Sequence, residues 1–458
     1  MPYPADPTSP TSKPALYGEQ TRRALENFPI SGRPLPPAFI HALGLIKACA
    51  ARVNGQLGRL PPAIAEAVAS AADQVAAGRH DDQFPVDTFQ TGSGTSSNMN
   101  ANEVIASLAA QHAERPVHPN DDVNAGQSSN DVVPTAIHLS AARELQGLKQ
   151  ALKALIDCID RRAAEFTDLV KTGRTHLMDA VPLTLAQELS GWSAQLESSI
   201  ARLEATEVRL LRLAQGGTAV GTGLNGHPEF AVRFAAELTR RSGLPFHAGE
   251  NVFELIASQD TAAELSGQLR VTALSLLKVA TDLRWMNSGP AAGLAEIRLP
   301  KLQAGSSIMP GKVNPVIPEA AAMVCVQVIG LDAAIALAAQ DNRFQLCTML
   351  PLIAADLLEQ IALLTQAARV LADKAIAGFE VNRARIAQSV ARNAMLVTAL
   401  APRIGYDLAA KIAQRALAED RAILDVAREE SDVPEAELRT MLEPAGLTGH
   451  PGSEGKTG

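Results

Sequence analysis

Apolar residues recur at helical spacing over two long stretches of this chain, and that pattern restricts the possible folds more than any other feature. The intervals alternate between three and four residues at Leu145, Leu148, Leu152, Leu155 and Ile159, and they do so nearly as regularly at Leu185, Leu189, Trp192, Leu196, Ile200 and Leu203. Such seams are typical of long helices that pack along their lengths. Residues 258–286, 319–340 and 350–372 are also compatible with long helices. About five long helices are therefore expected in the middle of the chain.

The composition agrees with a helical core. Hydrophobic residues make up 47% of the 458 residues and aromatic residues only 3%. A core with so few aromatic rings must consist of Ala, Leu, Val and Ile, which suit closely packed helices. We find no extended alternating strand pattern, and the predicted fold class is all-α. A single small core cannot cover the apolar faces of all these helices, so the chain is also expected to form an oligomer.

Charge and cysteine usage exclude several classes of protein. The net charge is -8 and no run of Lys or Arg is present, which argues against nucleic acid as a partner. The four cysteines lie far apart without a C-x-x-C pair, so we predict neither a zinc site nor a disulfide framework, and a cytoplasmic location. The first residues lack the apolar segment of a signal peptide, and no window reaches about 18 consecutive apolar residues, so no membrane partner is expected.

Shorter helices are predicted on both sides of the bundle, at residues 19–27, 36–53, 103–113, 383–401 and 406–428, whereas residues 85–100 are predicted to be non-helical. The predicted organisation has five parts. They are a disordered lead (1–14), an N-terminal domain (15–134), a central helix-bundle domain (135–378), a small C-terminal helical domain (379–445) and a disordered tail (446–458).

Two polar clusters lie before the first long helix. Residues 87–100 are dense in Ser, Thr, Gly and Asn, and they form either a flexible linker or part of a binding site. Residues 118–131 begin with His118, which fits an ordinary surface turn. The cluster ends with Ser128, Ser129 and Asn130, which fit helix caps as well as a site.

Two further clusters carry groups suited to acid–base chemistry. Residues 171–179 interrupt the apolar seams, and His176 beside Thr175 at this helix junction is either a proton carrier or a structural histidine. Residues 305–315 read Gly-Ser-Ser-Ile-Met-Pro-Gly-Lys-Val-Asn-Pro. They have the composition of a mobile loop whose N–H groups, Lys312 and Asn314 can hold an anion. The alternative is a glycine-rich connection between helices.

Taken together and in this order, the four clusters resemble the fumarase/aspartase superfamily, and the loop at 305–315 is the most specific of them. The resemblance covers roughly residues 15–445. It implies an all-helical, three-domain fold with a central bundle of five long helices. It also implies a homotetramer that binds a small dicarboxylate in active sites shared between subunits, with a tetrameric helical core.

Within the superfamily, the sequence resembles class II fumarase more than aspartate ammonia-lyase. Asp122 and Ser129 match the fumarases, where ammonia-lyases tend to have histidine and threonine, although the string from Asn314 to Glu319 is similar to the ammonia-lyase version. The implied activity is the reversible hydration of fumarate to (S)-malate, a step of the tricarboxylic acid cycle. The alternatives are an ammonia-lyase, a lyase for another N-substituted succinate, and a non-catalytic relative of the lens-protein kind. The retained polar residues argue against the last.

The resemblance also assigns roles to individual residues. Ser306 would be the catalytic base, His176 would handle the departing water, Glu319 would polarise that histidine, and Lys312 would assist. The substrate would be held by Ser93, Thr95, Ser128, Ser129, Asn130, Thr175, Ser307, Lys312 and Asn314. A second dicarboxylate site would comprise Arg115, His118, Asn120 and Asp121. No step of this chemistry needs a metal or an organic cofactor.

Three residues depart from the family pattern. Gly126, Leu331 and Cys347 stand where serine, asparagine and asparagine are usual, and these departures are expected to bear on substrate choice rather than on proton transfer.

Overall fold

The computed structural model describes residues 14–303, 305 and 307–449. The predicted lead therefore lies outside the described residues except for Pro14, and so does most of the predicted tail. Residues 446 and 447 of that tail belong to a short 3-10 helix, η5 (Pro444–Leu447).

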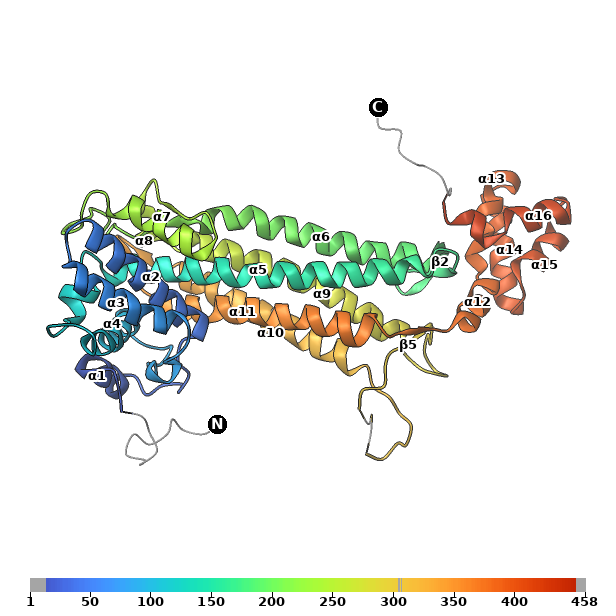
Figure 1. The fold of residues 1–458 in the computed structure, drawn as a ribbon. Helices are drawn as coiled ribbons and strands as arrows, with labels where there is room; N and C mark the ends of the chain where they lie inside the picture. The colour runs from blue at the N-terminus through green and yellow to red at the C-terminus, as the bar shows by residue number, and fades with distance from the viewer. Residues whose placement is uncertain (1–13, 304, 306, 450–458) are drawn as a thin grey trace. The chain divides into compact units, whose positions relative to one another are not determined.

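Five long helices form the middle of the chain, which confirms the prediction from the apolar spacing (Figure 1). They are α5 (Ser129–Ala164), α6 (Leu185–Leu210), α9 (Asp260–Met286), α10 (Val316–Ala339) and α11 (Leu350–Leu371). The chain divides into two compact units, and each contains a segment of every long helix. Unit 1 comprises Met1–Gln150, Ser199–Leu274 and Val324–Gln366, and unit 2 comprises Ala151–Ser198, Ser275–Met323 and Ala367–Gly458.

In unit 1 the long helices are joined by polar contacts among their buried apolar side chains. Ser266 on α9 donates to Asp332 on α10 at 2.7 Å, and Gln360 on α11 donates to the Val328 carbonyl of α10 at 3.0 Å. Lys149 on α5 pairs with Glu207 on α6 at 2.5 Å. These contacts fix neighbouring helices against each other along the apolar seams.

Shorter helices complete unit 1. They are α1 (Glu19–Asn27), α2 (Pro37–Gln56), α3 (Pro62–Ala76), α4 (Thr95–Ala110), α7 (Phe230–Ser242) and α8 (Val252–Ala257). Gly44 lets α2 and α3 approach closely, since a Cβ there would lie 2.5 Å from the Ala76 nitrogen. The Glu103 carboxylate of α4 accepts hydrogen bonds from the backbone of Gly18, Gln20 and Thr21, which fixes the start of α1.

The prediction that residues 85–100 are non-helical is wrong for its last six residues. Gly94 has a left-handed backbone, with φ of 72°, and α4 begins immediately after it at Thr95. The Ser, Thr and Asn residues that indicated a loop instead form the first turns of a helix, since such residues are favoured at helix starts.

Unit 2 contains a β-hairpin, so the expectation of no extended strand is wrong here. Strand β1 (Val170–Thr175) pairs antiparallel with β2 (Met178–Thr184), and Gly173 lies where the register shifts. A Cβ at Gly173 would lie 2.6 Å from the Val181 oxygen, so the bulge needs glycine. His176 therefore lies at a hairpin tip and not at a helix junction.

The other strands are two-residue pairs: β3 (Arg212–Leu213) with β4 (His247–Ala248), β5 (Ile297–Arg298) with β8 (Glu380–Val381), and β6 (Asn342–Arg343) with β7 (Leu346–Cys347). A short π-helix, η2 (Pro119–Val123), precedes α5, η3 (Ala372–Ile376) follows α11, and η1 (Asp81–Gln83) precedes the loop before α4. The described structure is thus predominantly helical, which confirms the predicted fold class.

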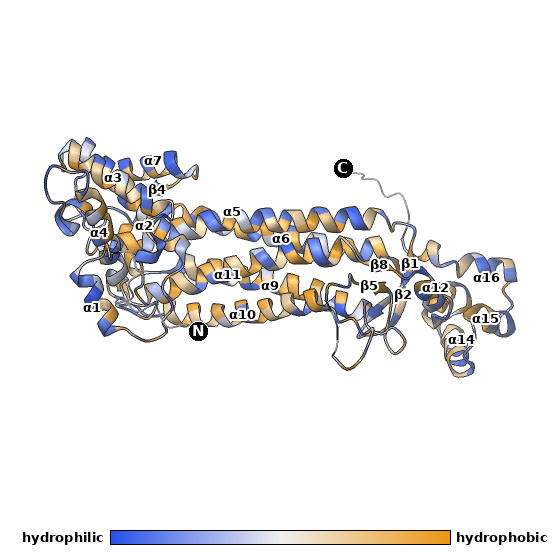
Figure 2. Cartoon of the chain, turned by 60° about the horizontal axis from the view of Figure 1, so that its bottom comes forward, coloured by the Kyte–Doolittle hydropathy of each residue, from blue (hydrophilic) through white to orange (hydrophobic). Residues whose placement is uncertain are grey.

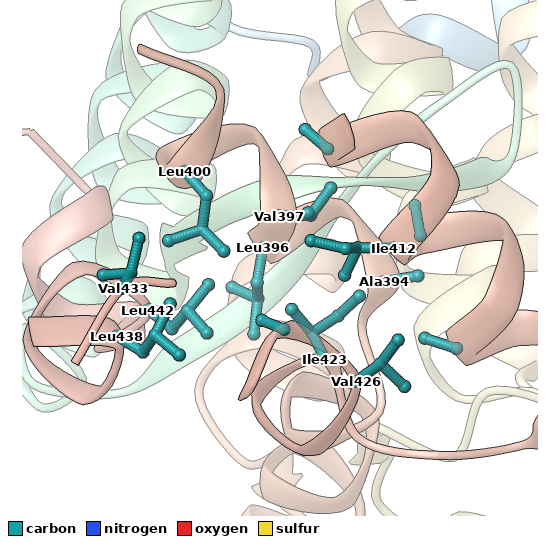
Figure 3. Close-up of a cluster of buried hydrophobic side chains, with 14 residues drawn as sticks. Ala394, Leu396, Val397, Leu400, Ile412, Ile423, Val426, Val433, Leu438 and Leu442 are labelled. Carbon is teal, nitrogen blue, oxygen red and sulfur yellow. The ribbon is translucent and has the colours of Figure 1, made fainter. Parts of the chain in front are cut away.

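The C-terminal helices have a hydrophobic core of their own (Figure 3). They are α12 (Arg383–Ala391), η4 (Ala394–Leu400), α13 (Ala401–Ile404), α14 (Tyr406–Glu419), α15 (Ile423–Glu430) and α16 (Glu435–Met441). Leu396, Leu400, Ile412, Val426 and Leu438 point toward one another in this core. The predicted helix at 406–428 is interrupted at Asp420, whose φ of 53° ends α14.

Helix α10 leaves several large apolar side chains exposed, and Figure 2 shows apolar residues around much of it. Met323, Val326 and Leu337 are each more than 60% exposed. By length and composition alone, residues 316–339 and 350–376 are long and apolar enough to cross a membrane, with 28% and 67% of their most apolar windows buried.

Candidate active site

The loop at residues 305–315 lies in unit 2 and is closed at its base. Asn314 donates from Nδ2 to the Gly305 carbonyl at 2.7 Å. A Cβ on Gly305 would lie only 1.9 Å from the Lys312 oxygen, so this closure requires glycine. The backbone turns again at Gly311, with φ of 83°, and α10 starts one residue after Pro315. Ser306 lies outside the described residues, while Ser307 and Lys312 are exposed.

A pocket of about 1150 Å³ opens beside this loop in unit 2. The loop contributes residues 311–315, α10 contributes Glu319, and the end of α9 and residues 287–290, 295, 297–301, 378 and 380–382 complete the lining. Four cationic side chains against two carboxylates give the wall a positive charge: Arg284, Arg298, Lys301 and Lys312 against Glu319 and Glu380. Such a wall favours an anionic ligand. The volume is larger than a small diacid needs, so this wall alone would not enclose one.

The hairpin tip in unit 2 presents Thr175 and His176. His176 and Leu177 form its two-residue turn with φ of 56° and 61°, a left-handed conformation that non-glycine residues adopt at a cost. His176, Leu177 and Met178 are all exposed, so the tip is not held by packing of its own side chains. Among the described residues, neither His176 nor Glu319 makes a side-chain hydrogen bond, so the expected contact between them is not formed there.

The base of the hairpin is fixed by buried charges that the sequence reasoning missed. Lys171 is fully buried, contacts the Glu188 carboxylate and lies 2.8 Å from Glu296 Oε2. Arg174 lies 2.5 Å from the other oxygen of Glu296, whose side chain is 1% exposed. Burial opposes ionisation of Glu296, but the hydrogen bond from Arg174 and the charge of Lys171 outweigh it, and the pKa of this carboxyl is lowered.

In unit 1, the predicted residues of the first cluster lie at the start of α4. Ser93 Oγ and Thr95 Oγ1 are 2.7 Å apart, on either side of Gly94. The preceding Gly92 packs on the segment before α11, because a Cβ there would lie 1.8 Å from the Thr348 oxygen, and its own carbonyl accepts from Leu350 N at 2.9 Å. The hydroxyls are thus held on a fixed backbone at the positive end of a helix.

The second predicted group, Ser128, Ser129 and Asn130, lies at the start of α5. Ser128 Oγ accepts from the Asn130 nitrogen at 3.2 Å, and Asn130 donates from its side chain to the Ala219 carbonyl at 2.8 Å. Asn98 on α4 donates to Ser129 Oγ at 3.0 Å. Unit 1 therefore brings these two predicted groups together, through one hydrogen bond between the starts of two helices.

A buried lysine supports this arrangement, and the sequence reasoning did not identify it. Lys47 is fully buried in α2 and donates to Asn124 at 2.7 Å and to Gln127 at 3.1 Å. Burial lowers the pKa of Lys47 to about 7, an effect that the charge of Asp131 partly offsets. A lysine within the apolar run of residues 39–51 was the signal that could have revealed it.

Asp131, in the first turn of α5, is the partner charge. Its carboxylate accepts from the backbone nitrogens of Ser128, Gly216 and Thr218 at 2.9 to 3.0 Å. Burial nevertheless raises the pKa of Asp131 to about 6. The carboxylate thus joins the start of α5 to the glycine-rich turn that follows α6.

The residues predicted for a second dicarboxylate site lie together around η2. Arg115 forms a two-pronged contact with Asp122, at 2.7 and 2.8 Å, and also donates to the Pro116 carbonyl. His118 Nδ1 accepts from the Asp121 nitrogen at 3.1 Å, while Asn120 and Asp121 are exposed. Much of the guanidinium of Arg115 is therefore already committed to Asp122, and the pKa of Asp122 is lowered by it.

Two of the three departures have a structural explanation. Gly126 has φ of 66°, a conformation in which a side chain would be strained. Cys347 is buried in β7, where burial raises the pKa of its thiol. Nothing in the structure explains Leu331. Among the described residues, no group of three or more His, Cys, Asp and Glu side chains is placed to hold a metal ion.

Comparisons with known proteins agree over most of the chain. A family model described as lyase matches residues 9–330, and one described as fumarase C C-terminus matches residues 396–449. The class II fumarate hydratase of Xylella fastidiosa is 57% identical over 435 residues, covering 95% of this chain and 92% of that protein. One from Pseudomonas aeruginosa is 55% identical over 435 residues, covering 95% of each. The crystal structure of recombinant class II fumarase from Schistosoma mansoni matches with a TM-score of 0.92 at 38% identity, covering 95% of this chain and 96% of that chain.

Proposed function

This chain belongs to the class II fumarase family of the fumarase/aspartase superfamily, and from that premise we infer that it is a lyase that catalyses the reversible hydration of fumarate to (S)-malate. The observation that carries this conclusion is the identity of 57% and 55% with two class II fumarate hydratases over 95% of the chain. The alternative activity, release of ammonia or an amine from aspartate or a related succinate, is not favoured by these relatives.

In the malate-to-fumarate direction, a base removes a proton from the carbon beside one carboxylate. The product is an aci-carboxylate carbanion with two negative charges on that end of the molecule, and the hydroxyl on the neighbouring carbon then leaves as water. The carbanion is the costly species, so the site must place donors where its charge accumulates. We assign this task to Lys312, Asn314 and the N–H groups of the loop at 305–315.

The base in this proposal is Ser306. Lowering the pKa of a hydroxyl by about five or six units requires roughly 7 to 8 kcal/mol of preferential stabilisation of the alkoxide. The Lys312 ammonium, converging N–H groups and the start of α10 together are of the right kind to supply it. Ser306→Ala is expected to abolish turnover while leaving the assembled protein intact. A near-normal rate in this variant would exclude Ser306 as the base.

His176 gives a proton to the departing hydroxyl, directly or through water, and Glu319 favours the charged form of the imidazole. Ser93, Thr95, Ser128, Ser129, Asn130, Thr175 and Ser307 hold the carboxylates and the hydroxyl of the substrate. The second site at Arg115, His118, Asn120 and Asp121 binds a further dicarboxylate. The domain boundaries at 134, 378 and 445 and a cytoplasmic location belong to the same proposal.

The active protein is a homotetramer whose active sites combine residues from several subunits. Three observations support this: the exposed apolar side chains of α10, the open pocket beside the loop, and the absence of a His176–Glu319 contact among the described residues. Light scattering should give four times the 48.2 kDa mass of the chain. Mixed tetramers of His176→Asn and Ser129→Ala should regain part of the activity that each variant lacks, whereas sites built from a single chain would regain none.

The reaction itself is tested with two substrates. Purified protein is incubated with (S)-malate and, separately, with L-aspartate, and fumarate is followed by its ultraviolet absorbance. Turnover of malate alone is the expected result. Turnover of aspartate alone would replace the hydratase by the ammonia-lyase, and turnover of neither by an intact tetramer would indicate a non-catalytic relative.

A further inference from the structure

The hairpin that carries His176 has a strained tip with little support of its own. Its two turn residues both adopt the left-handed backbone conformation without being glycine, and Leu177 and Met178 are 66% and 70% exposed. Strained backbone persists only where the surrounding structure determines it strongly, and such strain clusters at functional sites. Within the chain, the support for the tip must therefore come from the base of the hairpin.

The base supplies that support through four charged side chains within unit 2. Two cations of β1, Lys171 and Arg174, bind the two oxygens of the single buried carboxylate of Glu296, and Lys171 also contacts Glu188 at the start of α6. The two positive and two negative charges balance, so each cation has a partner. Arg174 lies two residues before His176, so the contact of its side chain with Glu296 fixes the backbone at the point where the turn begins.

Glu296 also belongs to the segment that leads into the loop at 305–315. It immediately precedes β5, and its backbone carbonyl accepts from Asn382 N at 2.8 Å beside the β5–β8 pair. On the other face of the hairpin, the buried amide of Asn393 donates to the Ala180 carbonyl at 2.8 Å and to Thr172 Oγ1 at 3.3 Å. The hairpin is thus fixed from one side by the stem of the loop and from the other by the start of η4.

We propose that Glu296 is a positioning residue for catalysis, which, through Lys171 and Arg174, holds the β1–β2 hairpin in the register and direction that His176 needs for proton transfer. The proposal rests on the role of His176 in the proposed function. Glu296 itself does not touch the substrate. Its lowered pKa is consistent with a carboxylate that stays ionised while it holds two cations.

The test is a kinetic double-mutant cycle in the assembled enzyme with malate as substrate. Glu296→Gln keeps the size of the side chain but removes its charge, so kcat is expected to fall by about 100-fold, as for a catalytic group displaced by about 1 Å. KM should change less than kcat, because Thr175 is the one proposed substrate-binding residue on the hairpin, whereas Ser93, Thr95 and Ser128–Asn130 are untouched. In the His176→Asn background the same substitution should lower kcat no further, since there is no histidine left to position.

Controls separate positioning from general stability. Glu207→Gln removes a different carboxylate that also binds a lysine, Lys149, but lies between α5 and α6 in unit 1. It is expected to lower the thermal midpoint without changing kcat. Arg174→Lys is the second variant, because it keeps the positive charge at the base of the hairpin and changes only the geometry of the contact with Glu296. It should show the same non-additivity with His176→Asn.

The outcomes distinguish the two proposals. If Glu296→Gln and Arg174→Lys lower kcat by the same factor with and without His176, or do not lower it at all, the positioning role is wrong and the proposed function stands. If His176→Asn turns over malate at the wild-type rate, the role of the histidine fails, and the positioning role fails with it. Non-additive loss in either variant, with unchanged kcat in Glu207→Gln, supports the inference.

Discussion

Gly305→Ala is expected to impair catalysis severely while leaving the fold intact. The added Cβ would lie 1.9 Å from the Lys312 oxygen, 2.6 Å from the Lys312 carbonyl carbon and 3.0 Å from Val313 Cα. The obstacle is backbone, which cannot rotate away as a side chain would. The part of the loop that carries Lys312 and Asn314 must therefore retreat by roughly 1.5 Å to reach an ordinary contact distance.

That displacement moves the groups proposed to stabilise the carbanion. A misplacement of about 1 Å can cost roughly 100-fold in rate, equivalent to about 2.7 kcal/mol of transition-state stabilisation. The stability of the fold should change by no more than about 0.5 kcal/mol, because the loop is exposed and buries no core. The loss should therefore appear in kcat/KM and not in the thermal midpoint.

The assay is steady-state hydration of fumarate, with thermal unfolding measured on the same preparations. The matched control is Gly147→Ala in α5, where a Cβ meets nothing within 4 Å. That substitution should leave kcat/KM unchanged and stabilise the helix by about 0.5 to 1 kcal/mol. If Gly305→Ala retained wild-type kcat/KM, the argument that the closed base of the loop places Lys312 and Asn314 would be refuted.

Three further predictions follow from buried groups. Lys47 loses its proton near pH 7 in the folded protein but only near pH 10.5 in the unfolded chain, so unfolding takes up a proton between these values. The free energy of unfolding should therefore rise with pH across that window, by up to about 1.4 kcal/mol per pH unit. Urea titrations of the Lys47→Met variant should lack this pH dependence. All four cysteines are free and buried, and burial raises the pKa of Cys49 and Cys325 to about 12. The native protein should therefore not react with a thiol reagent at pH 8, whereas the denatured protein should show four reactive thiols. Rapid labelling of the native protein would contradict the burial. Leu400→Ala removes a fully buried side chain from the C-terminal core and should lower the free energy of unfolding of that core by about 2 to 5 kcal/mol, as measured by chemical denaturation. An unchanged denaturation midpoint would show that this core does not contribute to cooperative unfolding.

The long helices could be predicted from the sequence because their signal is periodic and local. An apolar residue every three or four positions, over residues 145–159 and again over 185–203, predicts a long helix, and α5 and α6 follow it. Helices α9, α10 and α11 lie in stretches whose sequence is compatible with long helices. The polar clusters could also be located, since Gly, Ser and Asn in a chain otherwise built of apolar helices are conspicuous. The two helix starts that join Asn98 to Ser129 were thus anticipated as clusters, though not as neighbours.

The hairpin escaped prediction because its turn carries none of the usual residues. His176 and Leu177 occupy positions where Asn-Gly would have announced a two-residue turn, and Pro182 weakens the strand signal of β2. The ion network at its base could not be predicted for a different reason. Lys171 and Glu296 are 125 residues apart, and no local pattern in the sequence relates them.

The uncovered face of α10 has a consequence for biosynthesis. A newly made chain exposes Met323, Val326 and Leu337 on a helix that faces partner subunits in the proposed tetramer, and until such partners arrive any other apolar surface can compete for it. Yield in a recombinant host should therefore depend on how quickly chains meet relative to how quickly they aggregate, and slower synthesis with abundant chaperones should favour the native assembly.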